Sequence, residues 1–395
     1  MKNSALKTLA GLFFIAMLAA CGGNDPEAED MDDIEDEMEQ SAITQTFGGR
    51  IDIDNLPDYA NQQIPNYISK DNTDNNQITD EGATLGRVLF YDKNLSSDNT
   101  VSCASCHQQS VAFGDGLQAS QGVNGTTGRH SMRLVNARFA DEEHFFWDER
   151  ANTLEIQTTQ PIQDHVEMGF SGQDGDESID DLIVKLQAIP YYQELFTHAF
   201  GDETVTEARM QNAMAQFVRS IQSFDSRYDV GRAMVGNDGA NFPNLSAEEN
   251  TGKQLFITRA TIANGVRIGG GLGCGGCHRA PEFDIDPDSR NNGVVASLSG
   301  EGTDDGVTRS PSLRDIFNAN GQLNGGLMHT GDMDLEAVLD HYNNVTSNRN
   351  NVDRRVRGQQ LMMTQQEKDA VVAFIKTLSG SDIYTNEKWS DPFID

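Results

Sequence analysis

Two Cys-x-x-Cys-His motifs constrain what this chain can fold into more than any other feature of its sequence. The first runs from Cys103 to His107 and the second from Cys274 to His278. In such a motif the two thiols can add across the vinyl groups of one haem, and the histidine that follows can bind the iron. We therefore predict two covalently bound c-type haems. The predicted attachment residues are Cys103, Cys106, Cys274 and Cys277, and the predicted iron ligands are His107 and His278.

A zinc site and disulfide bonds are the alternatives for these cysteines. A zinc site made of two Cys-x-x-Cys pairs usually has far less chain between the pairs than separates Cys106 from Cys274. A disulfide within each pair would not need the histidine that follows it. Only Cys21 lies outside the two motifs. Covalent haem therefore explains the pattern better than either alternative.

The N-terminus has the pattern of an export signal. Lys2 and Lys7 precede an apolar run that ends at Leu18 and is too short to span a membrane. Residues 18–21 then resemble a bacterial lipobox, in which the leader is cut before the cysteine and the cysteine is acylated. We predict a signal peptide over residues 1–20 and a lipid anchor at Cys21, with the protein in the periplasm. Glycine rather than aspartate follows the cysteine, which favours the outer membrane.

Acidic residues outnumber basic ones, with 61 Asp and Glu against 29 Lys and Arg and a formal charge of -32. This charge argues against binding to nucleic acid or to an anionic membrane surface, and it favours a basic protein partner. The acidic stretch from Asp25 to Glu39 has almost nothing to bury. We therefore expect residues 21–50 to form an acidic, disordered tether between the lipid and the folded body.

The length of the chain favours two domains, because one hydrophobic core rarely serves so many residues. A weak internal repeat supports this division: Gly86–Phe90 precedes the first motif and Gly252–Phe256 precedes the second, each at the end of an expected short helix. Helical spacing of apolar residues is common, whereas alternating strand patterns are scarce. The clearest helical stretches are 179–186, 205–224, 335–342 and 366–378.

These patterns predict a mostly α fold with two cytochrome c-like haem domains and long loops. We place an N-terminal haem domain over residues 51–235 and a C-terminal haem domain over residues 236–395. The join is expected within residues 228–245, which are rich in Gly, Asn and Pro and show little periodicity.

Further sequence blocks surround the two motifs in a fixed order. The blocks are Leu85–Asp92, Phe146–Met168, Ser310–Arg314 with His329–Gly331, and Glu367–Leu378. Each block is weak by itself. Together they resemble the bacterial di-haem cytochrome c peroxidases and their relatives of the MauG type, from about Leu85 to Gly380.

The resemblance implies that the N-terminal haem reacts with hydrogen peroxide and that the C-terminal haem receives or stores electrons. Gln157, Pro161 and Glu167 then line the open face of the first haem. Of these residues, Glu167 can carry a proton between the two peroxide oxygens while the O–O bond breaks. Trp147 matches the family's tryptophan between the haems and is expected to relay electrons. Arg314 is expected to face a haem propionate.

The chain departs from the activatable peroxidases of this family in loop 122–128, which contains no histidine. In those enzymes a loop histidine blocks the reactive iron until the protein is reduced. We therefore expect the reactive haem to be open at rest unless His130 reaches the iron. His130 also replaces an asparagine that helps to bind an interdomain calcium in the family, which argues against calcium here.

The second haem also departs from the common pattern, in which a methionine is the sixth ligand. Alignment from Leu335 places Tyr342 at that position, as in MauG-type enzymes. Because Leu335, Leu339 and Tyr342 share one helix face, we expect the phenol to face the core and His341 to be more exposed. The alternative ligands are Met328, Met333, His329 and His341.

Three functions fit these features. The first is a peroxidase that reduces hydrogen peroxide with electrons from a small cytochrome c or another periplasmic donor. The second uses peroxide to oxidise residues of a partner protein, as MauG does, and is favoured only by Tyr342 and by the missing loop histidine. The third is a non-catalytic di-haem electron carrier, which would need strong sixth ligands on both irons.

Overall fold

Helices and long loops make up most of the described chain, which confirms the prediction of a mostly α fold. The residues that the computed structural model describes are 40–141, 144–284, 290–298, 303–345 and 351–394. They form one compact unit. No helix within these ranges is long and apolar enough to cross a membrane. The predicted signal peptide, the anchor at Cys21 and most of the predicted tether lie outside the described residues.

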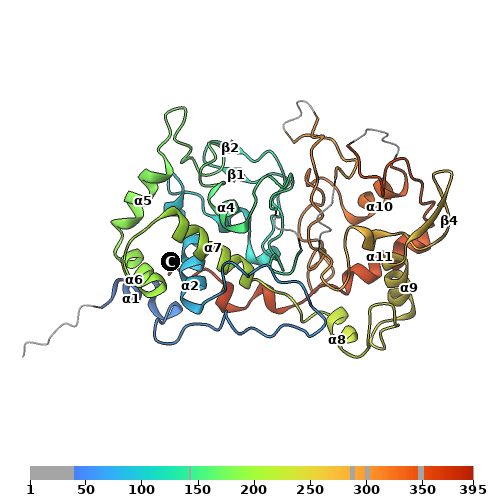
Figure 1. Cartoon of the computed structure of the whole chain (residues 1–395), viewed down its shortest axis with the longest axis horizontal. Coiled ribbons are helices and arrows are strands. Elements are labelled where there is room, and N and C mark those ends of the chain that lie inside the picture. Colours follow the sequence, from blue (N-terminus) through green and yellow to red (C-terminus); the bar gives the residue numbers. More distant parts are fainter. Residues whose placement is uncertain (1–39, 142–143, 285–289, 299–302, 346–350, 395) are drawn as a thin grey trace, which may run out of the picture. The chain divides into compact units, whose positions relative to one another are not determined.

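The helices follow one another in two sets along the chain (Figure 1). The first set is α1 (Ala42–Phe47), α2 (Asp80–Tyr91), α3 (Cys103–Cys106), α4 (Leu154–Thr159), α5 (Ile179–Gln187), α6 (Pro190–Phe200) and α7 (Glu207–Ser220). The second set is α8 (Arg227–Ala233), α9 (Ala247–Ile257), α10 (Leu335–Asn343) and α11 (Gln365–Lys376). Short 3-10 helices are η1 (Gly48–Arg50), η2 (Lys93–Leu95), η3 (Gln109–Val111), η4 (Cys274–Gly276), η5 (Asp382–Tyr384) and η6 (Glu387–Trp389).

The strands of the described chain form two antiparallel hairpins. In the first, β1 (Gln121–Gly122) pairs with β2 (Gly125–Thr126). In the second, β3 (Ala260–Ala263) pairs with β4 (Val266–Gly270) around a turn at Asn264 and Gly265. Both turn residues have positive φ, 51° and 80°, as a tight Asn-Gly hairpin turn requires.

The folded body begins earlier than the sequence predicted, because α1 belongs to the core. The Ser41 side chain caps α1 by accepting a hydrogen bond from the backbone N–H of Thr44. Ile43 and Phe47 lie four residues apart on one helix face, and both are buried in the apolar cluster that contains Leu195 of α6. The expected disordered tether over residues 21–50 is therefore wrong from α1 onward. Two apolar residues among polar neighbours are too weak a pattern to reveal so short a helix.

In each half of the described chain, two helices cross at a glycine. In the first half α2 packs on α7, and a Cβ atom on Gly86 would lie 2.0 Å from the carbonyl oxygen of Ala213. In the second half α9 packs on α11, and a Cβ atom on Gly252 would lie 1.8 Å from the carbonyl oxygen of Ala370. Any side chain would separate the helix backbones. The internal repeat in the sequence is therefore one helix crossing that the chain makes twice.

Apolar clusters of the core follow the two halves. Two clusters surround α2, α6 and α7, and a third surrounds α9 and α11 and runs from Tyr228 to Leu378. After Leu378 the chain returns to the first half, where Ile383 and Trp389 are buried. The ring of Phe393 lies 5.0 Å from that of Phe47 in α1, and Figure 1 shows the C-terminus on the same side as α1 and α6. The final segment therefore covers the first half, whereas the sequence assigned it to the C-terminal domain.

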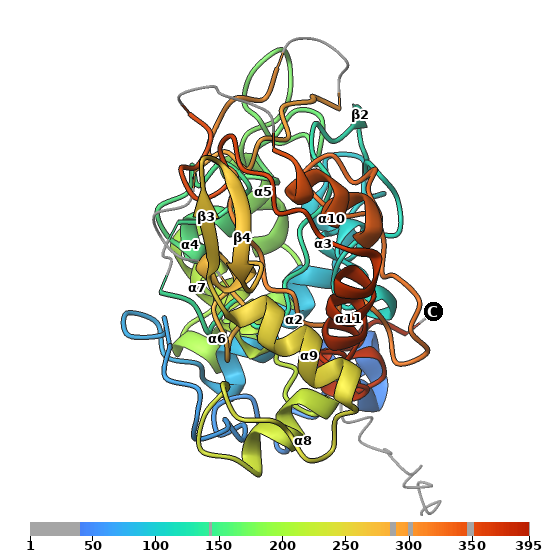
Figure 2. The same cartoon turned by 90° about the vertical axis from the view of Figure 1, so that its right-hand side faces the viewer.

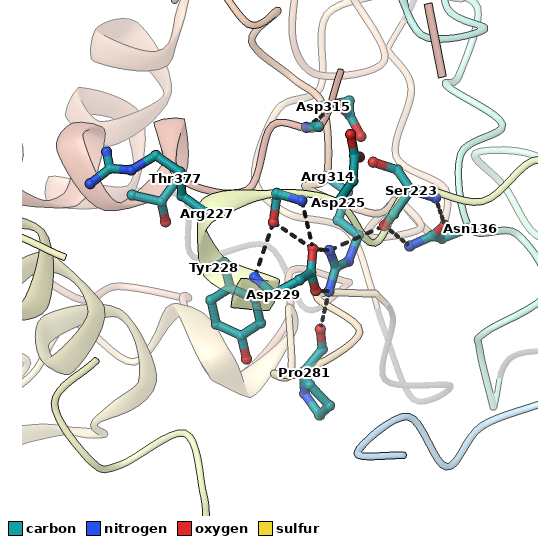
Figure 3. A network of polar contacts seen from close by, with 12 residues as sticks. Asn136, Ser223, Asp225, Arg227, Tyr228, Asp229, Pro281, Arg314, Asp315 and Thr377 are labelled. Carbon is teal, nitrogen blue, oxygen red and sulfur yellow. Dashed lines mark hydrogen bonds and ion pairs between the residues drawn. The ribbon is translucent and has the colours of Figure 1, made fainter. Parts of the chain in front are cut away.

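A buried arginine binds the segment that connects the halves (Figure 3). Arg314 is 0% exposed, and its two Nη atoms donate to the carboxylate of Asp229 at 2.9 and 3.0 Å. The same guanidinium donates to the carbonyl oxygens of Ser223 and Pro281. The Asn136 side chain, from the first half, both accepts from the Ser223 N–H and donates to its carbonyl oxygen. These contacts link an early loop, the connecting segment and the second half.

The contact between Arg314 and a haem propionate, which the resemblance implies, stays a prediction, and the structure shows the protein partners of Arg314. The guanidinium is occupied by Asp229 and by two backbone carbonyls. A buried charge of this kind is stable only when it is paired and hydrogen-bonded, which explains the dense set of acceptors around it. The sequence block that contains Arg314 thus serves the joint between the halves.

The glycine crossing in the second half can be tested by adding one methyl group. We expect Gly252→Ala to lower the free energy of unfolding by about 1–3 kcal/mol or more, because the new Cβ atom must displace the backbone of α11. The matched control is Gly236→Ala, since a Cβ atom at Gly236 meets nothing within 4 Å. Denaturant unfolding of both variants measures the difference. Equal stability of the two variants would contradict a crossing that depends on glycine.

Candidate active site

One cavity of about 720 Å3 brings together most of the residues that the sequence singles out in the first half. Its wall contains the first haem motif and the residues expected to face the reactive iron. The predicted residues along it are Cys103, Cys106, His107, Trp147, Gln157, Pro161 and Glu167. Phe90 of α2 and Met214 and Val218 of α7 supply apolar surface. Two thiols, an imidazole and apolar side chains around one cavity fit a covalently attached haem.

The first motif is held by a short helix and a tight turn. Ser102 and Ser105 form a capping box at the start of α3, so that both cysteines lie on one helical turn. The N–H of His107 donates to the carbonyl oxygen of Cys103 at 2.9 Å. The Nδ1 atom of His107 lies 3.3 Å from the carbonyl oxygen of Phe113, whose φ of 55° turns that carbonyl toward the ring. A proton on Nδ1 leaves Nε2 to bind iron.

Burial sets the protonation states around this motif. It lowers the pKa of His107, which favours the neutral imidazole that binds metal. It raises the pKa of Cys103 to about 12 and that of Cys106 to about 11, so both thiols are neutral near pH 7. Neither thiol is in a disulfide. Two neutral thiols beside a neutral histidine are the groups that thioether attachment and iron binding need.

The second motif repeats this arrangement. Cys274 lies in η4, and the N–H of His278 donates to its carbonyl oxygen at 3.0 Å. Phe283 again has positive φ, 57°, five residues after the histidine. Burial lowers the pKa of His278 to about 4 and raises that of Cys274 to about 12. The second motif can therefore hold a haem in the same way as the first.

The two motifs do not form a shared zinc site. Cys103 packs against one of the first-half clusters, and Cys274 packs against the second-half cluster. Across the part of the chain that the structure describes, no group of three or more His, Cys, Asp or Glu side chains could hold a metal ion. The described residues therefore favour covalent haem over a zinc site.

Glu167 has the acidity that a proton carrier in a dry pocket requires. Burial first, and then the negative charge of Asp164, raise its carboxyl pKa to about 7 against the opposing positive charge of Arg150. Its neighbour His165 is exposed instead, and its Nδ1 atom pairs with Asp176 at 2.8 Å. Glu167 lines the cavity, whereas His165 is not among the residues that line it.

The histidine-free loop is packed directly against Glu167. The N–H of Val123 donates to the carbonyl oxygen of Glu167, and the N–H of Asn124 donates to that of Val166, both at 3.1 Å. A Cβ atom on Gly122 would lie 2.1 Å from the carbonyl oxygen of Val166. The loop thus fixes the backbone that carries Glu167. Gly122 permits this close contact, and its sequence pattern did not reveal this role.

His130 and Trp147 form the side of the cavity nearest the second half. The indole N–H of Trp147 donates to the carbonyl oxygen of His130 at 2.7 Å, and the N–H of His130 donates to that of His329 at 2.8 Å. The Nδ1 atom of His130 lies 3.2 Å from the carbonyl oxygen of Gln118. The rings of Trp147 and His329 are 6.2 Å apart. The sequence did not reveal His329 as the second-half neighbour of Trp147, because the pair is nearly two hundred positions apart.

Arg129 is a further residue that sequence reasoning missed. Its guanidinium donates to Asp148 of the first half and to Asp304 of the second half, each at 2.7 Å. All three residues line the cavity. Arg129 therefore links the two halves at a part of the cavity wall to which both halves contribute residues.

Tyr342 lies beside the second motif. Its phenol pKa is raised, first by burial and then by the nearby Cys277 thiol, while a hydrogen bond with Asn292 opposes the shift. His341 and Tyr342 are both half-buried. The Nε2 atom of His341 lies 2.9 Å from the carbonyl oxygen of Asn292, and the Asn292 amide donates to the sulfur of Met328. Tyr342, His341 and Met328 therefore share one neighbourhood.

Comparison with known proteins agrees with this geometry. Residues 80–237 match the family model of the di-haem cytochrome c peroxidases. The chain is 31% identical over 315 residues to the methylamine utilization protein MauG of Methylorubrum extorquens, across 77% of this chain and 79% of that protein. It is also 31% identical over 224 residues to the cytochrome c peroxidase Ccp of Escherichia coli, across 55% of this chain and 43% of that protein.

A solved structure supports the same assignment. The crystal structure of a MauG-like protein associated with microbial copper homeostasis superimposes with a TM-score of 0.64 and 27% identity. The match covers 84% of this chain and 99% of that one. The order of the sequence blocks, the two haem motifs and these matches lead to one conclusion. This chain belongs to the family of the di-haem cytochrome c peroxidases and MauG.

Proposed function

We propose that this di-haem peroxidase reduces hydrogen peroxide at the first haem site with electrons that enter through the second. The observation that carries the proposal is the place of Glu167, which lines the same cavity as His107 and has a pKa of about 7. The bound haem supplies an iron that accepts peroxide and gives up electrons as the O–O bond breaks. Family membership makes the protein a peroxide-dependent oxidoreductase, so the non-catalytic carrier is not supported.

Glu167 is the proposed proton carrier. The inner peroxide oxygen must lose a proton, and the outer oxygen must gain one before it leaves as water. A carboxyl group with a pKa of about 7 can accept and return that proton near neutral pH. Gln157 lines the same cavity and can donate its amide N–H to a peroxide oxygen. The loop that fixes the Glu167 backbone keeps the carboxyl group on the cavity side.

Trp147 is the proposed electron relay. It is buried, and its indole N–H is bonded to the carbonyl oxygen of His130 at 2.7 Å, which fixes the orientation of the ring. The ring lies against His329, which comes from the second half. An aromatic ring between two redox centres divides one long electron transfer into shorter steps. The contact of Trp147 with a residue of the second half supports this role.

Oxidation of residues in a partner protein is a second candidate, and Tyr342 is the observation that favours it. We propose that Tyr342 is the sixth ligand of the second haem, because its buried phenol lies near enough to the attachment cysteine Cys277 for that thiol to raise its pKa. A phenolate stabilises ferric and higher oxidation states, whereas a methionine thioether favours ferrous iron. A tyrosine ligand therefore suits a haem that stores an oxidising equivalent for attack on another protein.

Three further proposals concern the surroundings of the enzyme. The export pattern and the lipobox at Cys21 support a periplasmic protein with a lipid anchor in the outer membrane. A small cytochrome c or another periplasmic protein is the proposed donor. We also propose that the protein works without the family's interdomain calcium, because His130 replaces the expected asparagine and Arg129 already lies between Asp148 and Asp304.

Replacing the carboxyl group tests the role of Glu167. Glu167→Gln is expected to slow the reaction with peroxide by about a hundredfold or more while both haems remain attached. The unmodified protein should react faster as pH rises through about 7, because the carboxylate form accepts the proton, and the variant should lose this dependence. Stopped-flow spectra between pH 5 and 9 measure both effects. Exposed Glu177→Gln is the matched control, and an equal pH profile in Glu167→Gln would assign Glu167 to structure.

The resting state of the first haem tests the loop argument. We expect the fully oxidised protein to show a high-spin ferric component and to react with peroxide without prior reduction, because loop 122–128 has no histidine and His130 is hydrogen-bonded elsewhere. Electronic and electron paramagnetic resonance spectra of the oxidised protein measure this. A wholly low-spin protein that is inert until half-reduced would show that a side chain caps the iron.

Exchange of the proposed ligand tests Tyr342. Tyr342→Met is expected to raise the reduction potential of the second haem and to introduce the weak near-infrared band of methionine-ligated ferric haem. Potentiometric titration and near-infrared spectra measure the change, and Tyr384→Phe, outside this site, is the control. If the unmodified protein already shows the methionine band, Met328 or Met333 is the ligand.

A further inference from the structure

The surface around the second haem motif has the opposite charge from the chain as a whole. Residues 257–279 contain three arginines and no Asp or Glu. Residues 351–363 contain three more arginines and a single aspartate, Asp353. The chain has a formal charge of -32, so these two segments are basic exceptions. We refer to their combined surface as the arginine face.

The two segments meet at the loop that attaches the haem. The N–H of Arg267 in β4 donates to the carbonyl oxygen of Gln360 at 2.8 Å, which joins the hairpin to the second segment. The Nη1 atom of Arg355 donates to the carbonyl oxygen of Gly276, between the attachment cysteines, also at 2.8 Å. Figure 2 looks onto this end of the second half and shows β3 and β4 above α9, with α11 next to α9. The arginine face therefore lies directly over the second haem motif.

Part of the positive charge is not neutralised within the protein. Arg267 pairs with Glu367 and Arg355 pairs with Asp353. Arg259, Arg354 and Arg357 are exposed, and none of these three has an ion pair with any residue of the described chain. They can therefore attract a carboxylate from outside.

Apolar side chains are exposed among these arginines. Ile268 is 69% exposed and Ile262 is 40% exposed on the hairpin, and Met362 is 62% exposed beside it. The pairing of β3 with β4 is irregular next to Ile262, so that Ile268 is the extra residue of a bulge. A bulge of this kind re-aims a side chain. Exposed isoleucine and methionine next to charged residues are typical of a surface that another protein covers.

We propose that the arginine face docks a small redox protein whose cofactor edge is surrounded by Asp and Glu. This inference rests on the proposed function, because it names the donor that feeds the second haem. One electron passes from the reduced partner to the second haem in each encounter. Two encounters reduce one hydrogen peroxide, with two protons, to two molecules of water. The overall charge suggested a basic donor, but the charge at the point of contact favours an acidic one.

Screening by salt explains why the local charge, rather than the net charge of the chain, selects the partner protein. At 0.1 M salt, charges further apart than about 10 Å are largely screened, so a docked partner feels the nearest side chains most. Over the rest of its surface the acidic chain repels an acidic partner. Such a partner is therefore directed to the arginine face, next to the second haem motif.

The experiment uses one electron donor in two forms of opposite net charge. Reduced mitochondrial cytochrome c is strongly basic, and succinylation of its lysines makes it acidic without removing its haem. We expect the holoenzyme to oxidise the succinylated form with the higher kcat/KM at low salt. Arg354→Glu with Arg357→Glu should lower that kcat/KM at least about tenfold, relative to the rate with a small-molecule donor. Ile268→Ser should weaken binding of the same cytochrome.

Lys93→Glu, a charge reversal at an exposed position of the first half, is the matched control and should change neither rate. The proposal is overturned if the basic cytochrome is the better donor and if Arg354→Glu with Arg357→Glu leaves kcat/KM unchanged for both the basic and the succinylated cytochrome. Direct binding of the succinylated cytochrome is measured as well. Failure of peroxide reduction with the small-molecule donor would instead contradict the proposed function, while the binding measurement still tests the arginine face.

Discussion

The close crossing of two helices at a glycine is the contact on which both haem sites depend. In the first half the crossing of α2 and α7 brings Phe90, Met214 and Val218 to one wall of the cavity. In the second half the last turn of α9 accepts a hydrogen bond at Leu255 from the N–H of Leu272, just before the second motif. A side chain at either glycine would push the helices apart. The glycines thus set the space into which each haem must fit.

Burial, more than any single charge, sets the pKa values of the groups in the first site. The same loss of water raises the pKa of Glu167, lowers that of His107 and keeps the thiol of Cys103 neutral. One dry pocket therefore provides a neutral metal ligand, neutral thiols and a carboxyl group that exchanges its proton near neutral pH. The loop at Gly122 completes this arrangement because it holds the backbone of Glu167 in place.

Electrostatic contacts join the two halves and leave one surface unpaired. Arg314 connects to Asp229, and Arg129 connects Asp148 to Asp304, so buried or half-buried arginines stabilise the joint on two sides. The arginine face lies at the far end of the second half, where three arginines have no such partner among the described residues. At the joint, arginines stabilise the contact between the two halves. Over the second haem motif, exposed arginines form the proposed binding surface for a partner protein.

The sequence by itself determined the haem motifs, their histidines and the mostly α class, because each is encoded in short, local patterns. The block around Glu167 was found through its resemblance to the di-haem peroxidases. The hairpin of β3 and β4 also has a local signal, Asn264-Gly265 between apolar residues, but it was not predicted. Only the tertiary structure decided the ion pair of Arg314, the contact of Trp147 with His329 and the charge around the second haem. These depend on segments that are distant along the chain, and no periodicity or spacing records which of them meet when the core closes.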